Sequence, residues 1–243
     1  MIGWTDVEST GLDEKIGDLL EVAIVVTDDQ LKEVAEMSFL IVPPDLDATI
    51  AKMDPYVRDM HTKNGLIDDL KSLSRERGSA DSLANIQSRM MTLVAEAFKD
   101  QPVIMTDRCA LCKLSLKSHL WGKEIDNPQA YCKSEVPGKF QPKFDTPISM
   151  TPLAGSTIPF DRRWLKQHMP LLEGLFSYRS IDVSTLTELA KRFAPAVYNA
   201  RPKKGEAHRA LLDVRESINY LRYYRENGLF GNGYDRAKLD EKR

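Results

Sequence analysis

The sequence predicts an α/β domain with a mixed sheet, and two observations lead to this class. Near the N-terminus three strand-like segments follow one another, and the second is a nearly continuous apolar run at residues 19–27. After residue 151, short strand patterns alternate with amphipathic helical ones. Strands followed by alternating helices and strands are typical of an α/β fold. We expect this domain to span residues 1–227, with an insertion at about 101–150.

The first twelve residues predict a strand that runs into a tight turn at residues 9–11. Because side chains alternate across a strand, the even-numbered residues from 2 to 8 share one face, which ends in Asp6 and Glu8. Two neighbouring carboxylates repel each other, and near a core they are stable only with a cation. An isolated pair is more commonly a solvated strand end, so its meaning depends on partners elsewhere in the chain.

The next segments complete the N-terminal half. Residues 19–27 suit a strand buried on both faces, and residues 34–42 form a further strand that ends at a pair of prolines. With the first strand they predict a three-stranded meander. Residues 47–73 predict short helices broken near Pro55 and near an Asn-Gly pair, and a stronger apolar helical pattern follows at residues 82–98.

The segment from about residue 101 to residue 150 differs in character from its surroundings. Prolines, lysines and glycines interrupt the pattern, and all three cysteines fall here, so we interpret it as an insertion. Two interpretations stay open. Either the cysteines are reduced thiols in a loop, or the insertion is a small subdomain that binds one structural Zn²⁺ through Cys109, Cys112, His119 and Cys132.

The C-terminal half predicts alternating elements: a strand at 151–155, a helix at 160–168, a strand at 178–183, a helix at 184–193 and a helix at 206–227. Thr185 and Glu188 have the spacing of a capping box for the second of these helices. Residues 194–205, rich in Pro, Lys and Arg, predict a mobile loop. The charged residues 228–243 predict a frayed tail.

Composition limits the class of protein and the class of ligand. Of the 243 residues, 29% are charged and 42% hydrophobic, as in globular proteins. We find no apolar run of the roughly 18 residues that a membrane helix requires and no secretory signal pattern. The odd number of cysteines argues against a disulfide framework, so we expect a cytoplasmic protein without a membrane partner. The net charge of -2 predicts that a nucleic-acid ligand is short or held by local cations.

Three separated motifs carry the candidate chemistry. They are Asp-Val-Glu-Ser-Thr-Gly-Leu at 6–12, Asp-Arg-Arg-Trp-Leu at 161–165 with Tyr-Arg-Ser-Ile-Asp-Val-Ser-Thr-Leu at 178–186, and His-Arg-Ala-Leu-Leu-Asp at 208–213. Each alone is a weak signal, but all three in this order resemble the DEDDh exonucleases and, within them, the oligoribonucleases. The resemblance covers residues 1–100 and 151–227 and implies a ribonuclease H-like mixed sheet flanked by helices.

The resemblance implies a 3′-to-5′ exonuclease that degrades short single-stranded RNA to mononucleotides with two divalent ions, Mg²⁺ or Mn²⁺. In the family four carboxylates hold these metals, and they correspond here to Asp6, Glu8, Asp161 and Asp213. Carboxylate oxygens are the ligands that such ions prefer. The family's general base corresponds to His208, and imidazole suits this role because its ordinary pKa of about 6.5 lies near working pH. Taken singly, Asp161 reads as a helix-start carboxylate and His208 as a surface histidine.

The resemblance also implies substrate contacts and a homodimer. Leu12 would wedge against a terminal base, and His61 would pack near one. Arg179 and Ser184 would hold the terminal 5′-phosphate, and Tyr178 would reach the site of a neighbouring subunit. The plainer alternatives are a turn hydrophobe for Leu12 and a surface ion pair for Arg179.

Several positions depart from the family pattern. Ser156-Thr157 stands where Asn-Ser is usual, Pro159-Phe160 replaces Gly-Gln, and Leu212 replaces an acid. Thr157 keeps a hydroxyl for a phosphate contact, and the expected metal ligands are intact. The departures therefore affect the expected preference for dinucleotides and not the expected metal site. A DEDDh enzyme that trims single-stranded DNA stays open, because discrimination by the 2′-hydroxyl cannot be read from the sequence. A binding module without catalysis would lack a carboxylate or the histidine, and none is lacking.

Overall fold

The computed structural model describes residues 1–76, 81–101, 147–203, 205 and 208–227, together with the backbone of short strands between residues 104 and 145. Its contacts divide the chain into two compact units. One comprises Met1–Ala97 and Thr151–Arg243, and the other is Phe98–Met150. The second unit therefore coincides, within a few residues, with the segment in which an insertion is expected.

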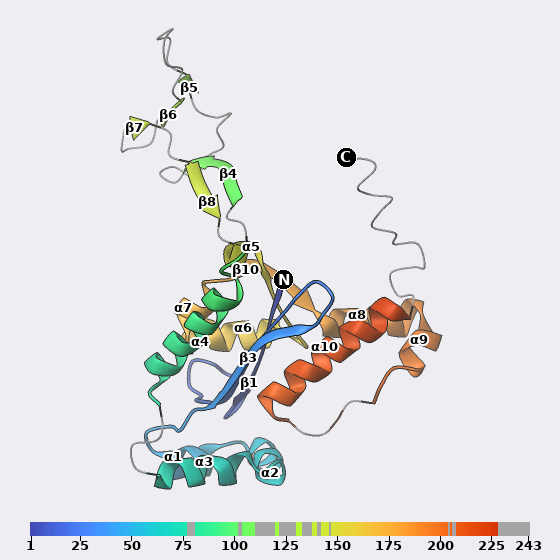
Figure 1. The fold of residues 1–243 in the computed structure, drawn as a ribbon. Coiled ribbons are helices and arrows are strands. Elements are labelled where there is room, and N and C mark those ends of the chain that lie inside the picture. The colour runs from blue at the N-terminus through green and yellow to red at the C-terminus, as the bar shows by residue number, and fades with distance from the viewer. Residues whose placement is uncertain are drawn as a thin grey trace. The chain divides into compact units, whose positions relative to one another are not determined.

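The first unit is built on a five-stranded mixed sheet (Figure 1). Its strands are β1 (Ile2–Ser9), β2 (Leu19–Thr27), β3 (Glu33–Leu40), β9 (Pro152–Gly155) and β10 (Ser177–Asp182). Their order across the sheet is β10-β9-β1-β2-β3. The pairs β1–β2 and β2–β3 are antiparallel, whereas β1–β9 and β9–β10 are parallel. The predicted α/β class with a mixed sheet and an N-terminal meander is confirmed.

The strand β2 is the centre of the meander, and all nine of its residues are buried. Its β-branched run therefore behaves as the sequence predicts for a strand covered on both faces. Gly155, at the end of β9, has no room for a side chain, because a Cβ there would lie 2.8 Å from the carbonyl oxygen of Thr5. Glycine thus permits the two strands to approach closely beside the acidic end of β1.

Four helices follow the meander: α1 (Leu46–Lys52), α2 (Pro55–Lys63), α3 (Leu66–Arg75) and α4 (Leu83–Ala97). Asp45 and Asp54 cap the first two by accepting backbone N–H donors, and Gly65 separates α2 from α3 with a φ of 80°. Leu66 and Leu70 of α3 pack in one buried cluster with Leu20 of β2. The predicted breaks near Pro55 and the Asn-Gly pair are confirmed.

The C-terminal helices are α6 (Pro159–His168), α7 (Pro170–Glu173), α8 (Val183–Phe193), α9 (Pro195–Asn199) and α10 (Ala210–Glu226). The predicted capping box is wrong, because Asp182 caps α8 and accepts the N–H of Ser184 at 3.0 Å. The expected loop at 194–205 contains α9. The last helix starts at Ala210 rather than at residue 206, since His208 has a φ of 42° and Arg209 is extended.

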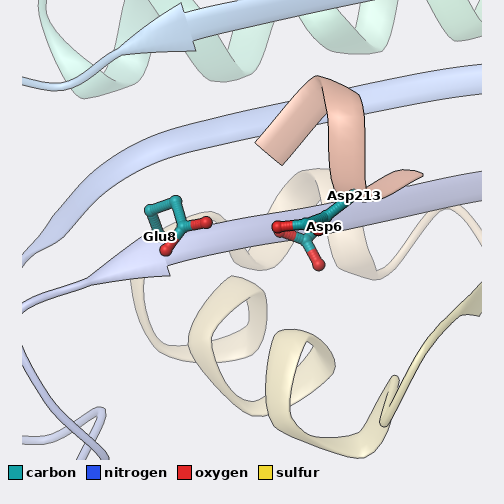
Figure 2. Close-up of side chains that lie close together, drawn as sticks. All are labelled: Asp6, Glu8 and Asp213. Atoms are coloured by element: carbon teal, nitrogen blue, oxygen red, sulfur yellow. The ribbon is translucent and has the colours of Figure 1, made fainter. Parts of the chain in front are cut away.

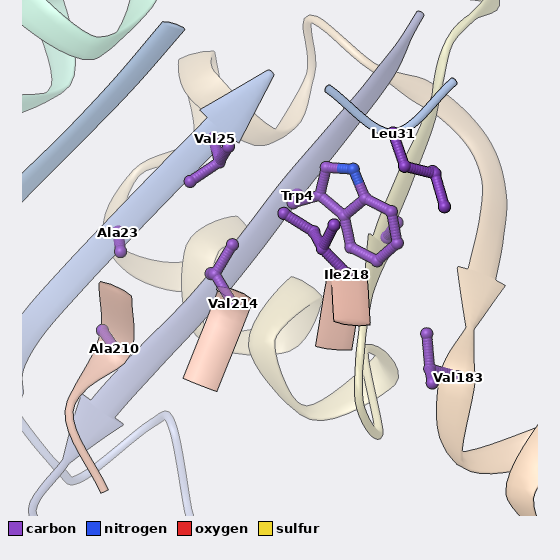
Figure 3. Packing of buried hydrophobic residues seen from close by; sticks show 9 residues of the cluster. Trp4, Ala23, Val25, Leu31, Val183, Ala210, Val214 and Ile218 are labelled. Atoms are coloured by element: carbon purple, nitrogen blue, oxygen red, sulfur yellow. The ribbon is translucent and has the colours of Figure 1, made fainter. Parts of the chain in front are cut away.

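The helix α10 packs on β1 and β2 through the cluster drawn in Figure 3. Trp4 of β1 is fully buried against Val214 and Ile218 of α10, and its indole N–H donates to Thr27 Oγ1 at 2.9 Å. Trp4 belongs to the face of β1 that also carries Asp6 and Glu8. The hydrophobic contact between Trp4 and α10 therefore brings the first turn of α10 beside these carboxylates.

The second unit contains β4 (Ile104–Cys109), β5 (Leu120–Trp121), β6 (Ala130–Cys132), β7 (Gly138–Lys139), β8 (Pro142–Asp145) and α5 (Pro147–Met150). Strand β4 pairs with β8, and β5, β6 and β7 form a three-stranded sheet. For the predicted zinc ligands, Cys112 and His119 lie outside the described residues, and Cys109 and Cys132 are described in their backbone only. The tail at 228–243 lies outside as well. Within the described part of the chain, no helix combines the length and apolar character needed to cross a membrane.

Candidate active site

All five residues predicted to carry the chemistry line one cavity of about 380 Å³ in the first unit. They come from three places in the chain: Asp6 and Glu8 from β1, Asp161 from α6, and His208 and Asp213 from the start of α10. The cavity walls also include Thr157 and Ser184. Residues more than 200 positions apart therefore meet at the end of β1 that enters the turn.

Three of the carboxylates form a close group (Figure 2). Asp6, Glu8 and Asp213 each offer a carboxylate oxygen, and these oxygens lie within 4.8 Å of one another. Glu8 is 8% exposed and Asp213 is 9% exposed, so their charges are shielded little by water. Like charges this close are unfavourable unless a cation joins them, and hard oxygen donors fit a divalent ion such as Mg²⁺ or Mn²⁺. The group has the composition and spacing of a metal site.

The fourth carboxylate, Asp161, faces the same cavity but is bound to the backbone of β1. Its Oδ1 accepts the N–H of Val7 at 3.0 Å, and the residue is only 3% exposed. Burial, together with the nearby charges of Asp182 and Asp213, raises the pKa of Asp161 to about 8, against the lowering effect of the backbone hydrogen bonds. The raised pKa favours the protonated form of Asp161 in the absence of a cation, and a bound cation would favour the carboxylate.

His208 has a backbone conformation that is rare for a residue with a Cβ. Its φ of 42° places it outside helical geometry immediately before α10. The carbonyl oxygen of His208 accepts a hydrogen bond from Asn64 Nδ2 at 2.5 Å, and Asn64 Oδ1 accepts the N–H of Leu66 at 3.0 Å. The turn between α2 and α3 therefore holds the histidine backbone in its strained conformation.

The residues that follow His208 are anchored to a buried acid, Glu21 of β2. Arg209 donates to both carboxylate oxygens of Glu21 at 3.1 and 3.3 Å, and Ala210 N–H donates to the same group at 3.1 Å. Arg209 also bonds to Asp69 at 2.8 Å. Glu21 lies opposite Glu8 in the β1–β2 register. The start of α10 is thus fixed directly beside the carboxylate group.

Sequence reasoning missed Asn64, Glu21, Arg209 and Asp182 as parts of the site. Glu21 did leave a signal, because it is the one acid within an otherwise apolar strand and an unpaired acid is rarely tolerated there. Asp182 also had one, because it precedes a helix that it could cap. Nothing in the local pattern pairs Asn64 with a residue 144 positions away.

His61 lies beneath the site instead of on its surface. The side chain is fully buried, its Nε2 is 3.0 Å from the carbonyl oxygen of Ser9, and its Nδ1 is 3.9 Å from Glu8 Oε2. Burial lowers the pKa of His61, so the ring is neutral and its Nε2–H donates to Ser9. In this structure His61 supports the end of β1 and offers no exposed surface to a base.

The remaining predicted substrate residues fall into two groups. Thr157 and Ser184 meet at the cavity wall, where their hydroxyl oxygens are 3.0 Å apart. Leu12 and Tyr178 are both 81% exposed, and neither lines the cavity. The guanidinium of Arg179 lies 4.9 Å from the Tyr178 ring centre and is also outside the cavity lining. Of these five residues, the structure therefore brings only Thr157 and Ser184 into the cavity that the carboxylates line.

Comparison with known proteins gives one consistent result. No protein-family model matches this chain. An oligoribonuclease of Azoarcus sp. (strain BH72) is 34% identical over 226 residues, covering 93% of each chain. The oligoribonuclease of Thiobacillus denitrificans is 35% identical and covers 92% of each chain, and that of Corynebacterium diphtheriae is 32% identical, covering 94% of this chain and 83% of its own.

Two solved structures are also similar to this chain. They are exonuclease I of Methylocaldum szegediense, with a TM-score of 0.47 and 16% identity, and E. coli exonuclease I in complex with an oligonucleotide, with a TM-score of 0.48 and 11% identity. This chain spans 40% of the length of each of them.

Proposed function

This chain belongs to the oligoribonuclease family, and on that premise we propose that it is a 3′-to-5′ exoribonuclease that hydrolyses short single-stranded RNA to mononucleotides. The observation that carries the proposal is one cavity lined by His208 and by Asp6, Glu8 and Asp213, whose carboxylate oxygens lie within 4.8 Å of one another. We place the enzyme in the cytoplasm, because an odd number of cysteines does not suit a secreted disulfide framework.

Asp6, Glu8, Asp161 and Asp213 would hold two divalent ions, Mg²⁺ or Mn²⁺. When bound, such ions provide a strong nucleophile from water at neutral pH and neutralise charge on the phosphate and the leaving 3′-oxygen. The pair from β1 and the residue from α10 supply the ligand group, which the Trp4 contact with α10 keeps together. Asp161, bound to the Val7 N–H, adds a ligand whose orientation β1 itself fixes.

The remaining residues prepare the proton transfer and bind the RNA. His208 is the general base that accepts a proton from the attacking water, a step to which neutral imidazole is suited. The hydrogen bond from Asn64 and the Glu21–Arg209 pair keep its backbone in place, so little reorganisation is needed during the reaction. The hydroxyls of Thr157 and Ser184, which also line the cavity, can donate to phosphate oxygens.

The proposed activity is tested with 5′-labelled RNA and DNA from dinucleotides to 20-mers, incubated with Mg²⁺ or Mn²⁺. We expect RNA to shorten one nucleotide at a time from its 3′ end, with shorter RNA processed faster and no turnover in a chelator. DNA of equal length should be hydrolysed more slowly, because it lacks the 2′-hydroxyl contacts. Cleavage in the middle of the chain, or DNA hydrolysed faster than RNA, would contradict the proposal.

We propose further that the enzyme is a homodimer in which Tyr178 contributes to the partner's site. Tyr178 is 81% exposed on β10, an edge strand, and an aromatic residue so placed is typical of an interface. We expect light scattering to show a dimer and Tyr178→Ala to lower dinucleotide turnover more than turnover of longer RNA. Leu171→Ala, which removes a 63% exposed side chain from α7, is the control. A fully active monomer would contradict this expectation.

A further inference from the structure

Two serines that line the cavity have no part in the proposed chemistry, yet they join two segments that carry carboxylates. Ser156 lies between β9 and α6, and Ser217 lies on α10, one turn after Asp213. Their hydroxyl oxygens are 2.8 Å apart, although the two residues are 61 positions apart in the sequence. The pair is therefore a direct contact between the segment that leads to Asp161 and the helix that carries Asp213.

The direction of this hydrogen bond follows from the second partner of Ser217. Ser217 Oγ lies 3.0 Å from the carbonyl oxygen of Asp213, which can only accept, so the Ser217 hydroxyl proton is used there. Ser156 must then donate its own proton to Ser217 Oγ. Two hydrogen bonds in series thus lead from Ser156 to the backbone of Asp213. Because Ser217 is only 3% exposed, water competes little for them.

These two bonds complete the support of the Asp213 backbone. The Asp213 N–H donates to the Arg209 carbonyl at 2.9 Å, and the Arg209 side chain is bound to Glu21 of β2. The Asp213 carbonyl accepts from Ser217, which is bound to Ser156 at the end of β9. The peptide groups on the two sides of Asp213 are thus tied to different strands of the sheet. A backbone held in this way limits the positions that the Asp213 carboxylate can take.

The segment that carries Ser156 is itself held by hydrogen bonds as far as Asp161. Thr157 has a φ of 58°, and its N–H donates to Asp182 Oδ1 at 2.9 Å. The Thr157 carbonyl accepts the N–H of Phe160 at 2.9 Å, within the first turn of α6. Asp161 is the next residue of that turn. A short, hydrogen-bonded turn therefore connects Ser156 to the fourth carboxylate.

The distance between Asp161 and Asp213 matters for the proposed metals. The charge of Asp213 contributes to the raised pKa of Asp161, so the two carboxylates act on each other. They come from the first turns of α6 and α10, and their distance depends on how these two turns are joined. Mg²⁺ tolerates little deviation in the distances to its oxygen ligands. A small displacement of α10 relative to α6 would therefore weaken metal binding even where the fold is kept.

We propose that Ser156 and Ser217 are positioning residues that set the distance between Asp161 and Asp213 and thereby the affinity for divalent ions. The inference rests on the proposed function, because that function assigns these carboxylates to the metals. Neither serine contacts a reacting atom in this role, since each acts through Asp213. The role includes Ser156, a position at which this sequence departs from the family pattern.

The experiment measures Mn²⁺ binding by calorimetry, without substrate, for wild type and for single and double variants. We expect Ser156→Ala to weaken the binding of at least one ion about three- to tenfold, the range of one lost hydrogen bond. Ser156→Thr keeps the hydroxyl and should bind like wild type. Ser217→Ala should lose at least as much as Ser156→Ala, because it removes both hydrogen bonds. Adding Ser156→Ala to Ser217→Ala should cause no further loss, since Ser156 acts only through Ser217.

The rate of RNA hydrolysis provides a second measurement on the same variants. In Ser156→Ala the Mg²⁺ concentration for half-maximal rate should rise by the same factor as the Mn²⁺ dissociation constant. The kcat at saturating Mg²⁺ should stay close to that of wild type, because the carboxylates and His208 are unchanged. Ser88→Ala, which changes an exposed serine of α4, is the matched control and should equal wild type in both measurements.

Three results would overturn the inference. They are an unchanged Mn²⁺ affinity in both alanine variants, a loss in Ser156→Thr as large as in Ser156→Ala, and additive losses in the double variant. A lower melting temperature with unchanged Mn²⁺ affinity would identify the serines as structural only. If wild type binds Mn²⁺ but does not hydrolyse RNA, the proposed function fails, and the Mn²⁺ affinities of the variants still decide the role of the serines. A wild type that binds no Mn²⁺ would overturn both.

Discussion

Asp213→Asn should lower the rate of RNA hydrolysis by about a thousandfold or more, because one lost metal ligand removes several kcal/mol of charge stabilisation. The substitution keeps the shape of the side chain but halves its oxygens and removes the charge from a group whose oxygens lie within 4.8 Å of one another. Asp6→Ala should have an effect of the same order, since Asp6 belongs to the same group. The measurement is single-turnover hydrolysis of a labelled dinucleotide at saturating Mg²⁺.

The same variants should leave the fold intact. In a chelator, Asp213→Asn should unfold at the same temperature as wild type or slightly above it, because the repulsion within the carboxylate group is relieved. Asp68→Asn, an exposed acid of α3, serves as the matched control for both measurements. More than about a tenth of wild-type activity in Asp6→Ala or Asp213→Asn would exclude these residues as ligands of an essential metal.

His208→Ala should lower the rate about a hundred- to ten-thousandfold, the range that a positioned general base contributes. Metal affinity should stay close to that of wild type, because the proposed ligands are all carboxylates. Added imidazole should restore part of the rate, since the substitution leaves space in the cavity that His208 lines. Loss of metal binding in His208→Ala would instead identify the imidazole as a ligand.

Asn64→Ala tests how much the backbone position of His208 contributes to the rate while the imidazole itself is kept. It removes the 2.5 Å hydrogen bond to the His208 carbonyl but leaves the imidazole in the chain. We expect a smaller loss than for His208→Ala, of about tenfold, because a misplaced base still accepts protons. That loss should fall on kcat rather than KM, and imidazole should not restore it. A full rate in Asn64→Ala would show that Glu21 and Arg209 suffice to hold the start of α10.

How far the fold could be predicted depends on how local each signal is. The apolar run at Leu19–Thr27 identified one strand, because burial on both faces imposes such a run on consecutive residues, and the turn formers at residues 9–11 marked the end of the strand Ile2–Ser9. The Asn-Gly pair marked the break between α2 and α3, where Gly65 has a positive φ. The start of α10 was misplaced, because the strain at His208 is maintained by Asn64 and not by its neighbours in sequence.

By itself the sequence determined the five strands of the sheet, most helices of the first unit and the acids that line the cavity, since periodicity and motif spacing are properties of short segments. Only the tertiary structure decided that His61 is buried under Glu8, that Arg201 and not Arg179 lines the cavity, and that Glu21 receives Arg209 from 188 positions away. Such contacts depend on how helices pack on the sheet. The way the helices pack is determined by the burial of the whole core around Trp4, and the helix or strand propensity of a short segment does not specify that arrangement.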